Sequence, residues 1–208
     1  MNKLKVMNEK GNPIKAEVIC EDTDLMPMEL NIRNETSICF MYFNTLLPAY
    51  SFRTFNIQLV PSSETSTILE KQEIKKVGVQ YIPLPVKGGQ SELRLNPFNY
   101  KFSYACNSGA KDCVDVKEFD VNVLYYKGKD SGMQSFTLDG KPTSLRGKLL
   151  RHYYFVGEIA SQLTLEYEFL VLRLRVSDPE YIELETFIKR LPKNEFQHAQ
   201  FILGIVVP

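Results

Sequence analysis

The chain has 208 residues, of which 44% are hydrophobic and 24% charged, with 11 glycines and 11 prolines. This composition excludes a disordered or collagen-like chain, and the length suits one large β domain with its own core. Lys and Arg together number 25, as do Asp and Glu, which excludes the strongly basic surface of a general nucleic-acid binder.

The opening segment, MNKLKVMNEKGNPIKAEVIC, starts with Met and lacks the continuous apolar core of a signal peptide. The longest uncharged run, residues 36–52, contains Asn44 and Pro48 and is shorter than the roughly 18 apolar residues of a spanning helix. We therefore expect synthesis in the cytoplasm and no membrane span. The final location stays open and includes a virion or another assembled particle.

Residues 4–18, LKVMNEKGNPIKAEV, place two short apolar segments on either side of the turn sequence NEKGNP. Gly and Asn-Pro favour a tight turn, so the two segments are predicted to form an antiparallel hairpin. The segment is similar to the first hairpin of many prealbumin-like and immunoglobulin-like repeats. That resemblance implies a β-sandwich.

Alternation of apolar and polar residues predicts further strands at 28–33, 55–60 and 100–106. In the second of these we expect Phe55, Ile57 and Leu59 to face the core. These strands are typical of antiparallel sheets with one solvated face.

The loop before the second of these strands, NTLLPAYSF at residues 44–52, is apolar although loops are normally polar. Two hypotheses account for it: the loop folds back over the core, or it docks on a protein partner. The candidate partner-contact residues are Leu46, Leu47, Pro48 and Tyr50.

The cysteines offer little chemistry. Cys106 is predicted to end one strand and Cys113 to begin the next, while Cys20 and Cys39 lie inside strands without a CxxC spacing. Because no export signal is visible, reduced, half-buried thiols are the favoured interpretation. A disulfide between Cys106 and Cys113 remains the main alternative, with a metal or catalytic role behind it.

Two longer segments, 114–123 and 163–176, change the phase of their alternation midway. A β-bulge or a crossing between two sheets explains such a change. Between them, the Asp139-Gly140 pair predicts a hairpin turn that joins residues 134–138 to 141–145.

A local basic run, KPTSLRGKLLRH, contains no acidic residue. We interpret it as an edge strand whose basic side chains prevent aggregation, with contact to phosphate or an acidic partner as the alternative. Its members are Lys141, Arg146, Lys148 and Arg151.

The C-terminal region is predicted to contain one α-helix at residues 179–191, capped by Asp178 and ended by Pro192. Its apolar face comprises Tyr181, Leu184, Ile188 and Leu191. The last segment, FILGIVVP at 201–208, is apolar on both faces of any strand. We expect it to be internal to the chain's own sheet.

The predicted fold class is therefore mainly β: an antiparallel β-sandwich, immunoglobulin-like or jelly-roll-like, or a barrel, with one C-terminal helix. We expect a single domain over residues 1–208, with a possible sub-boundary at 127–134.

No catalytic constellation, metal site or cofactor motif is present, since His152 and His198 match no ligand pattern. The sequence predicts a non-enzymatic structural or interaction protein that oligomerises with itself or with protein partners. A β-sandwich subunit of a larger assembly, such as a virion, a phage tail or a secretion system, fits best. Two alternatives stay open: a ligand-binding or inhibitory immunoglobulin-like module, and a carbohydrate-active enzyme that uses Glu166 or Glu168.

Overall fold

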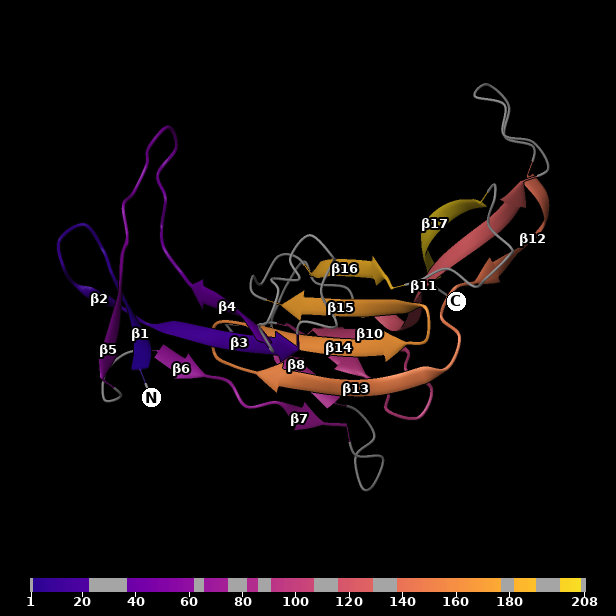
Figure 1. Ribbon diagram of the computed structural model, residues 1–208, viewed down its shortest axis with the longest axis horizontal. Coiled ribbons are helices and arrows are strands. Elements are labelled where there is room, and N and C mark those ends of the chain that lie inside the picture. Colours follow the sequence, from indigo (N-terminus) through magenta and orange to yellow (C-terminus); the bar gives the residue numbers. More distant parts are fainter. Residues whose placement is uncertain are drawn as a thin grey trace.

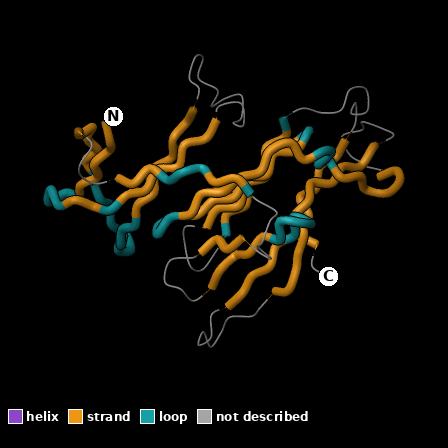
Figure 2. Tube along the Cα trace, turned by 90° about the horizontal axis from the view of Figure 1, so that it is seen from below, coloured by secondary structure: helices purple, strands orange, loops and turns teal. Residues whose placement is uncertain are grey.

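The computed structural model describes residues 2–22, 37–61, 66–74, 82–85, 91–106, 116–128, 138–176, 182–189 and 199–206. Every secondary-structure element assigned in these segments is a β-strand, and the strands form four sheets (Figure 1, Figure 2). The mainly β class with antiparallel sheets is confirmed. None of the four described sheets closes on itself, so the barrel alternative is wrong. The described part of the chain contains no helix with the length and apolar character needed to cross a membrane.

One end of the molecule is a three-stranded sheet in the order β2-β1-β5, formed by β1 (Asn2–Met7), β2 (Pro13–Ile14) and β5 (Asn56–Pro61). β1 and β2 are antiparallel, which confirms the predicted turn and the first part of the N-terminal hairpin, whereas residues 16–18 belong to β3 of another sheet. Asn8 shapes its turn, because the side-chain Oδ1 accepts hydrogen bonds from the backbone N–H groups of Lys10 and Asn12. Gly11 has a φ of 77°, a left-handed conformation that glycine adopts without steric cost.

β5 confirms the strand predicted from alternation, but the expected burial of its apolar residues is wrong. Ile57 and Leu59 are exposed, and Phe55 is half-buried. The physical reason is the position of β5 at the edge of a small sheet, which leaves its apolar face without a covering layer.

The second sheet has the order β4-β3-β6, with β3 (Ala16–Asp22) antiparallel to β4 (Ser37–Phe43) and parallel to β6 (Ser66–Ile68). Cys20 and Cys39 lie directly opposite each other in the β3–β4 ladder and form a disulfide, with Cα atoms 4.0 Å apart. The prediction of reduced thiols is therefore wrong for this pair. It depended on the missing export signal, which carries no information about the register of two strands.

Alkylation of the denatured, unreduced protein is expected to leave Cys20 and Cys39 unmodified, because each sulfur is bonded to the other. Peptide mass spectrometry should detect the two cysteine-containing peptides as one linked species, which separates on reduction. Alkylation of Cys20 without reductant would contradict the pairing. Cys106 ends β10 as predicted, and Cys113 lies outside the described residues.

The third sheet lies in the middle of the molecule (Figure 1) and has the order β16-β15-β14-β13-β7. Its strands are β7 (Gln72–Glu73), β13 (Leu149–Val156), β14 (Ser161–Tyr167), β15 (Leu170–Val176) and β16 (Glu183–Ile188). The bulge or sheet crossing expected in the segment 163–176 is wrong, because Glu168 and Phe169 form a turn that makes β14 and β15 an antiparallel hairpin. The phase change in the sequence marks this reversal.

The predicted C-terminal helix is also wrong over the described residues. β16 occupies the centre of the expected 179–191 segment and pairs with β15, with Glu183 opposite Arg175 and Glu185 opposite Arg173. These cross-strand pairs of opposite charge favour the extended conformation. The helix was predicted only from the spacing of apolar residues within the segment. The charge pairs depend on arginines that lie about ten positions earlier in the chain.

The fourth sheet joins β12, β11, β10, β9 and β8 in that order, with β17 paired to β11. The strands are β8 (Ile82–Pro85), β9 (Ser91–Leu95), β10 (Phe102–Cys106), β11 (Val116–Gly128), β12 (Leu138–Ser144) and β17 (Ala199–Val206). The register between β10 and β11 shifts by one residue between Val116 and Phe119, so the predicted bulge in this segment is confirmed. The predicted hairpin at Asp139-Gly140 is wrong, because both residues lie within β12, beside a register shift against β11.

β17 pairs with β11 over eight consecutive residues, so the C-terminal segment is a strand of the chain's own sheet, as expected. The predicted strand at 28–33 lies outside the described residues. So does most of the candidate boundary at 127–134, of which only Lys127 and Gly128 are described, at the end of β11.

Two apolar clusters occupy opposite faces of the central sheet. The larger cluster contains side chains of the central sheet, such as Leu163 and Leu172, together with Leu93 and Phe102 of the fourth sheet. The smaller one contains Ile19 of β3 together with residues of β13 and β15. Because the central sheet is covered on both faces, all residues of β14 are buried, including the polar ones.

Candidate partner-contact arm

Between β4 and β5 the chain leaves the sheets as a long, hairpin-shaped loop, residues 44–54, which we call the arm (Figure 1). Its large apolar side chains are exposed, to 79% for Leu46 and 91% for Phe52. The hypothesis that this loop folds back over the chain's own core is therefore wrong. The exposed members of the arm are Leu46, Leu47, Pro48, Tyr50 and Phe52.

The base of the arm is held by an aromatic contact. Phe43 at the end of β4 and Phe55 before β5 pack edge to face, with ring centroids 4.9 Å apart. At the tip, the Ser51 hydroxyl donates a hydrogen bond to the Pro48 carbonyl at 2.5 Å, and Tyr50 has a φ of 55°. A tyrosine in this left-handed region is uncommon, and the turn directs the side chain into solvent.

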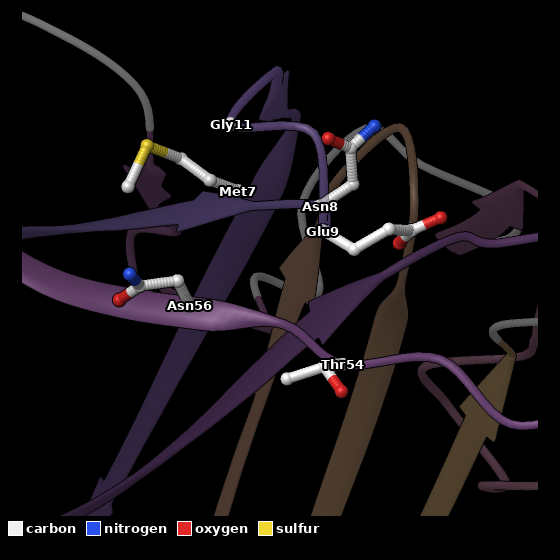
Figure 3. A pocket seen from close by; sticks show the side chains of 6 residues that line it. All are labelled: Met7, Asn8, Glu9, Gly11, Thr54 and Asn56. Atoms are coloured by element: carbon white, nitrogen blue, oxygen red, sulfur yellow. The ribbon is translucent and has the colours of Figure 1, made fainter.

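A shallow pocket of about 440 Å³ lies between the arm's returning leg and the first hairpin (Figure 3). Thr54 and Asn56 line it from one side, and Met7, Asn8 and Glu9 from the other. Four of its six lining residues have polar side chains, and the pocket is open to solvent. It adds hydrogen-bonding groups next to the apolar arm.

β3, which carries β4 and hence the arm, is fixed to the central sheet by two buried carboxylates. The first is Glu21, whose Oε1 accepts hydrogen bonds from Gln162 at 2.6 Å and Thr164 at 2.7 Å. Its Oε2 lies 2.5 Å from Nε of Arg173. The side chains of Glu21 and Arg173 are 0% and 2% exposed, so this ion pair is isolated from water. Burial and the neighbouring Glu21 raise the pKa of Tyr153, which donates to the same carboxylate.

The second carboxylate is Glu17. Its side chain accepts hydrogen bonds from the backbone N–H groups of Glu158, Ile159 and Ala160, at 2.7, 2.8 and 3.1 Å. These three groups belong to the turn between β13 and β14. Gly157 leaves room for the carboxylate, because a Cβ at this position would overlap Glu17 Oε2.

Glu166, the candidate catalytic acid, lies in a separate ion-pair cluster. Arg151 and Lys189 both donate hydrogen bonds to its buried carboxylate. Burial alone would raise the pKa of Glu166, but these two cations together hold it below its ordinary value. A general acid needs a proton at neutral pH, whereas the lowered pKa favours the charged form of Glu166. Glu168 lies in the turn after β14 rather than beside Glu166 on the strand.

The four residues of the basic run are spread over three elements. Lys141 lies in β12, Arg146 and Lys148 in the loop that follows, and Arg151 in β13. Arg146 forms an ion pair with Asp120 at 2.5 Å, and Arg151 pairs with Glu166 and Asp22. Two of the four charges are thus matched by carboxylates of the chain itself.

A second pocket, of about 330 Å³, lies between Phe40 of β4 and the strands β15 and β16. Its charges are paired, Arg175 with Glu183 at 2.9 Å and Arg173 with Glu185 at 3.2 Å. Beside it, burial raises the pKa of Tyr42 to about 12 although Arg175 acts in the opposite direction. In the described segments, no three His, Cys, Asp or Glu side chains gather into a group that could hold a metal ion.

Sequence reasoning found the arm because a run without charges stands out in a loop. It missed Glu17, Glu21 and Arg173, for which it predicted no role. The available signal was a row of polar residues that runs across two neighbouring strands, with Gln162 and Thr164 of β14 beside Arg173 of β15. In the structure this polar row is buried.

No protein-family model matches the chain, and the search of curated proteins found no match. The function must therefore be argued from the arm and its support.

Proposed function

We propose that the chain is a non-enzymatic interaction protein, a subunit of a larger assembly, and that the arm is the segment that binds its protein partner. The observation that carries the proposal is the exposure of Leu46, Leu47, Tyr50 and Phe52 on a loop that projects from the sheets and has no charged residue from 44 to 52. Burial of an apolar side chain of this size contributes about 1.5–3 kcal/mol. A partner with an apolar groove would supply that burial.

The fixed base of the arm supports the same role. The Phe43–Phe55 contact closes the loop at its foot, and the Cys20–Cys39 disulfide ties β4 to β3. A loop that is restrained before binding loses less conformational entropy when it docks. The arm is therefore suited to insertion as a preformed unit.

In this proposal the arm stands on a β-sandwich whose two layers are the central sheet and the fourth sheet. Support comes from the single apolar cluster to which both sheets contribute. The disulfide adds a condition on location, because such bonds persist in oxidising compartments and outside cells. An assembly that is exported or exposed at a surface fits this condition.

The double variant Leu46→Asp with Leu47→Asp is expected to leave the free energy of unfolding unchanged within about 0.5 kcal/mol, because exposed side chains add little to the core. It should abolish the complex that the wild type forms in the cells that produce it. Thermal unfolding measures the first effect, and native gel electrophoresis of the extract measures the second. Leu150→Asp, at an apolar residue exposed outside the arm, is the matched control and should retain the complex. A large loss of stability in the double variant would show that the arm serves the chain's own fold.

A further inference from the structure

We propose that β5 pairs edge to edge with β5 of a second copy of this chain, across a two-fold axis through Gln58. This surface is separate from the arm. β5 is an outer strand of its sheet and pairs only with β1 among the described strands. Six consecutive pairs without a bulge keep it regular, so its outer edge presents a straight row of backbone N–H and C=O groups.

The side chains on both faces of β5 are exposed, so none of them blocks a strand that pairs with its outer edge. Ile57 and Leu59 are exposed to 50% and 70% on one face, and Asn56 and Gln58 are exposed on the other. In the dimer, the exposed apolar pair of one β5 would lie beside the same pair of the second copy. The pairing needs no change in the first sheet.

The position of the axis follows from the sequence of the strand. Two identical antiparallel strands related by a two-fold axis pair residues whose numbers have a constant sum, and opposite side chains share a face. An axis through Gln58 places Ile57 opposite the copy's Leu59, twice, and the two Gln58 amides opposite each other. It uses residues 56–60 and leaves Pro61, which has no N–H, outside the new ladder. An axis through Leu59 would put Pro61 into it, and an axis through Ile57 would shorten it.

Charge also favours a second copy as the occupant. No residue from Thr54 to Ser63 is charged, so two β5 strands can meet without like-charge repulsion. Lys5 of β1 lies opposite Gln58, and in the pair it would be three strand spacings from its own copy, about 14 Å. That separation exceeds the screening length of about 8 Å at physiological ionic strength.

Several of the other edge strands carry features that prevent such pairing. β16 presents Glu183 and Glu185, and β8 contains Pro83 and Pro85. β12 contains Pro142 and a register shift. β4 is uncharged, but its side chains from Met41 to Phe43 are partly covered. β5 has no charge, no bulge and no proline before its last residue.

A cysteine trap tests the register. In the proposed dimer, Gln58→Cys places two cysteines with Cα atoms about 4.5–5.5 Å apart, within the range that a disulfide bridges. Asn56→Cys, the matched control on the same face, places them about four residues apart along the ladder, roughly 13 Å. Mild oxidation of the full chain should give a linked dimer with Gln58→Cys, and Asn56→Cys should stay at the wild-type level on a non-reducing gel. Equal linkage of both variants, or linkage of neither, overturns the proposal.

Sedimentation velocity gives an independent readout. The wild type should shift from monomer to dimer as its concentration rises to about 100 μM, a range typical of weak association. Leu59→Lys should remove the shift, because it places a charge in the new interface, whereas Leu150→Lys should keep it. A wild type that stays monomeric throughout, or a Leu59→Lys variant that still dimerises, contradicts the pairing. The arm variant Leu46→Asp with Leu47→Asp should still form the Gln58→Cys link, so failure of one proposal leaves the other standing.

Discussion

Replacement of Glu21 by alanine is expected to lower the free energy of unfolding by about 3–5 kcal/mol. The carboxylate of Glu21 balances the guanidinium of Arg173, which is buried with it, and it accepts hydrogen bonds from Gln162 and Thr164. Its loss leaves Gln162 and Thr164 without this acceptor and leaves the buried Arg173 with only the part-exposed carboxylate of Glu185 as its counter-ion. Urea unfolding, followed by far-UV circular dichroism, measures the change as a lower midpoint.

The double variant Glu21→Ala with Arg173→Ala should be destabilised by less than the sum of the two single variants. Each single change strands the partner's charge, and the double change strands neither. Glu158→Ala is the control, because it breaks the exposed Lys15–Glu158 pair and such pairs contribute at most about 1 kcal/mol. Additive effects at Glu21 and Arg173 would show that the two side chains do not interact.

Replacement of Glu17 by alanine is expected to lower the free energy of unfolding by about 3 kcal/mol, since three backbone N–H groups lose their acceptor and two of them are buried. Gly157→Ala should cost a similar amount for a different reason. It removes no polar group, but its Cβ would displace the Glu17 carboxylate from the turn. The same urea unfolding experiment measures both.

The two changes share one contact, so Gly157→Ala should cost less in a Glu17→Ala background than in the wild type, although the close contact of the new Cβ with the Ala160 carbonyl oxygen remains. Gly147→Ala does not serve as a control, because Gly147 has a positive φ and a close contact of its own with Phe169. Gly11→Ala is better, because its Cβ would meet no atom and only the strain of its positive φ would remain. Full additivity of Glu17→Ala and Gly157→Ala would contradict the role assigned to the turn.

The parts of the fold that could be predicted depend on neighbouring residues. The hairpin at residues 4–18 carries its own turn sequence, and the bulge in β11 leaves a visible phase change. The β14–β15 hairpin was missed because Glu168 and Phe169 include none of the usual turn residues. β16 was mistaken for a helix because the signal that favours a strand, the pairing of Glu183 and Glu185 with arginines, lies in β15.

The candidate site shows the same division. The arm could be predicted, because an uncharged run in a loop is a local feature. Its support could not, because the burial of Glu17 and Glu21 depends on β3 lying against the central sheet, and the disulfide depends on the register of β3 and β4. The exposed edge of β5 depends on the order of strands in its sheet, which alternation does not contain.

The central claim, that the arm binds a protein partner, is tested most directly by site-specific photo-crosslinking. A photoreactive phenylalanine analogue in place of Tyr50, introduced in the cells that produce the protein, should form a defined adduct with one partner on irradiation. The same analogue in place of Lys10, an exposed residue of the first hairpin, should not, and Leu46→Asp with Leu47→Asp should abolish the Tyr50 adduct. Adducts of equal yield from both positions, or none from the arm, would contradict the claim.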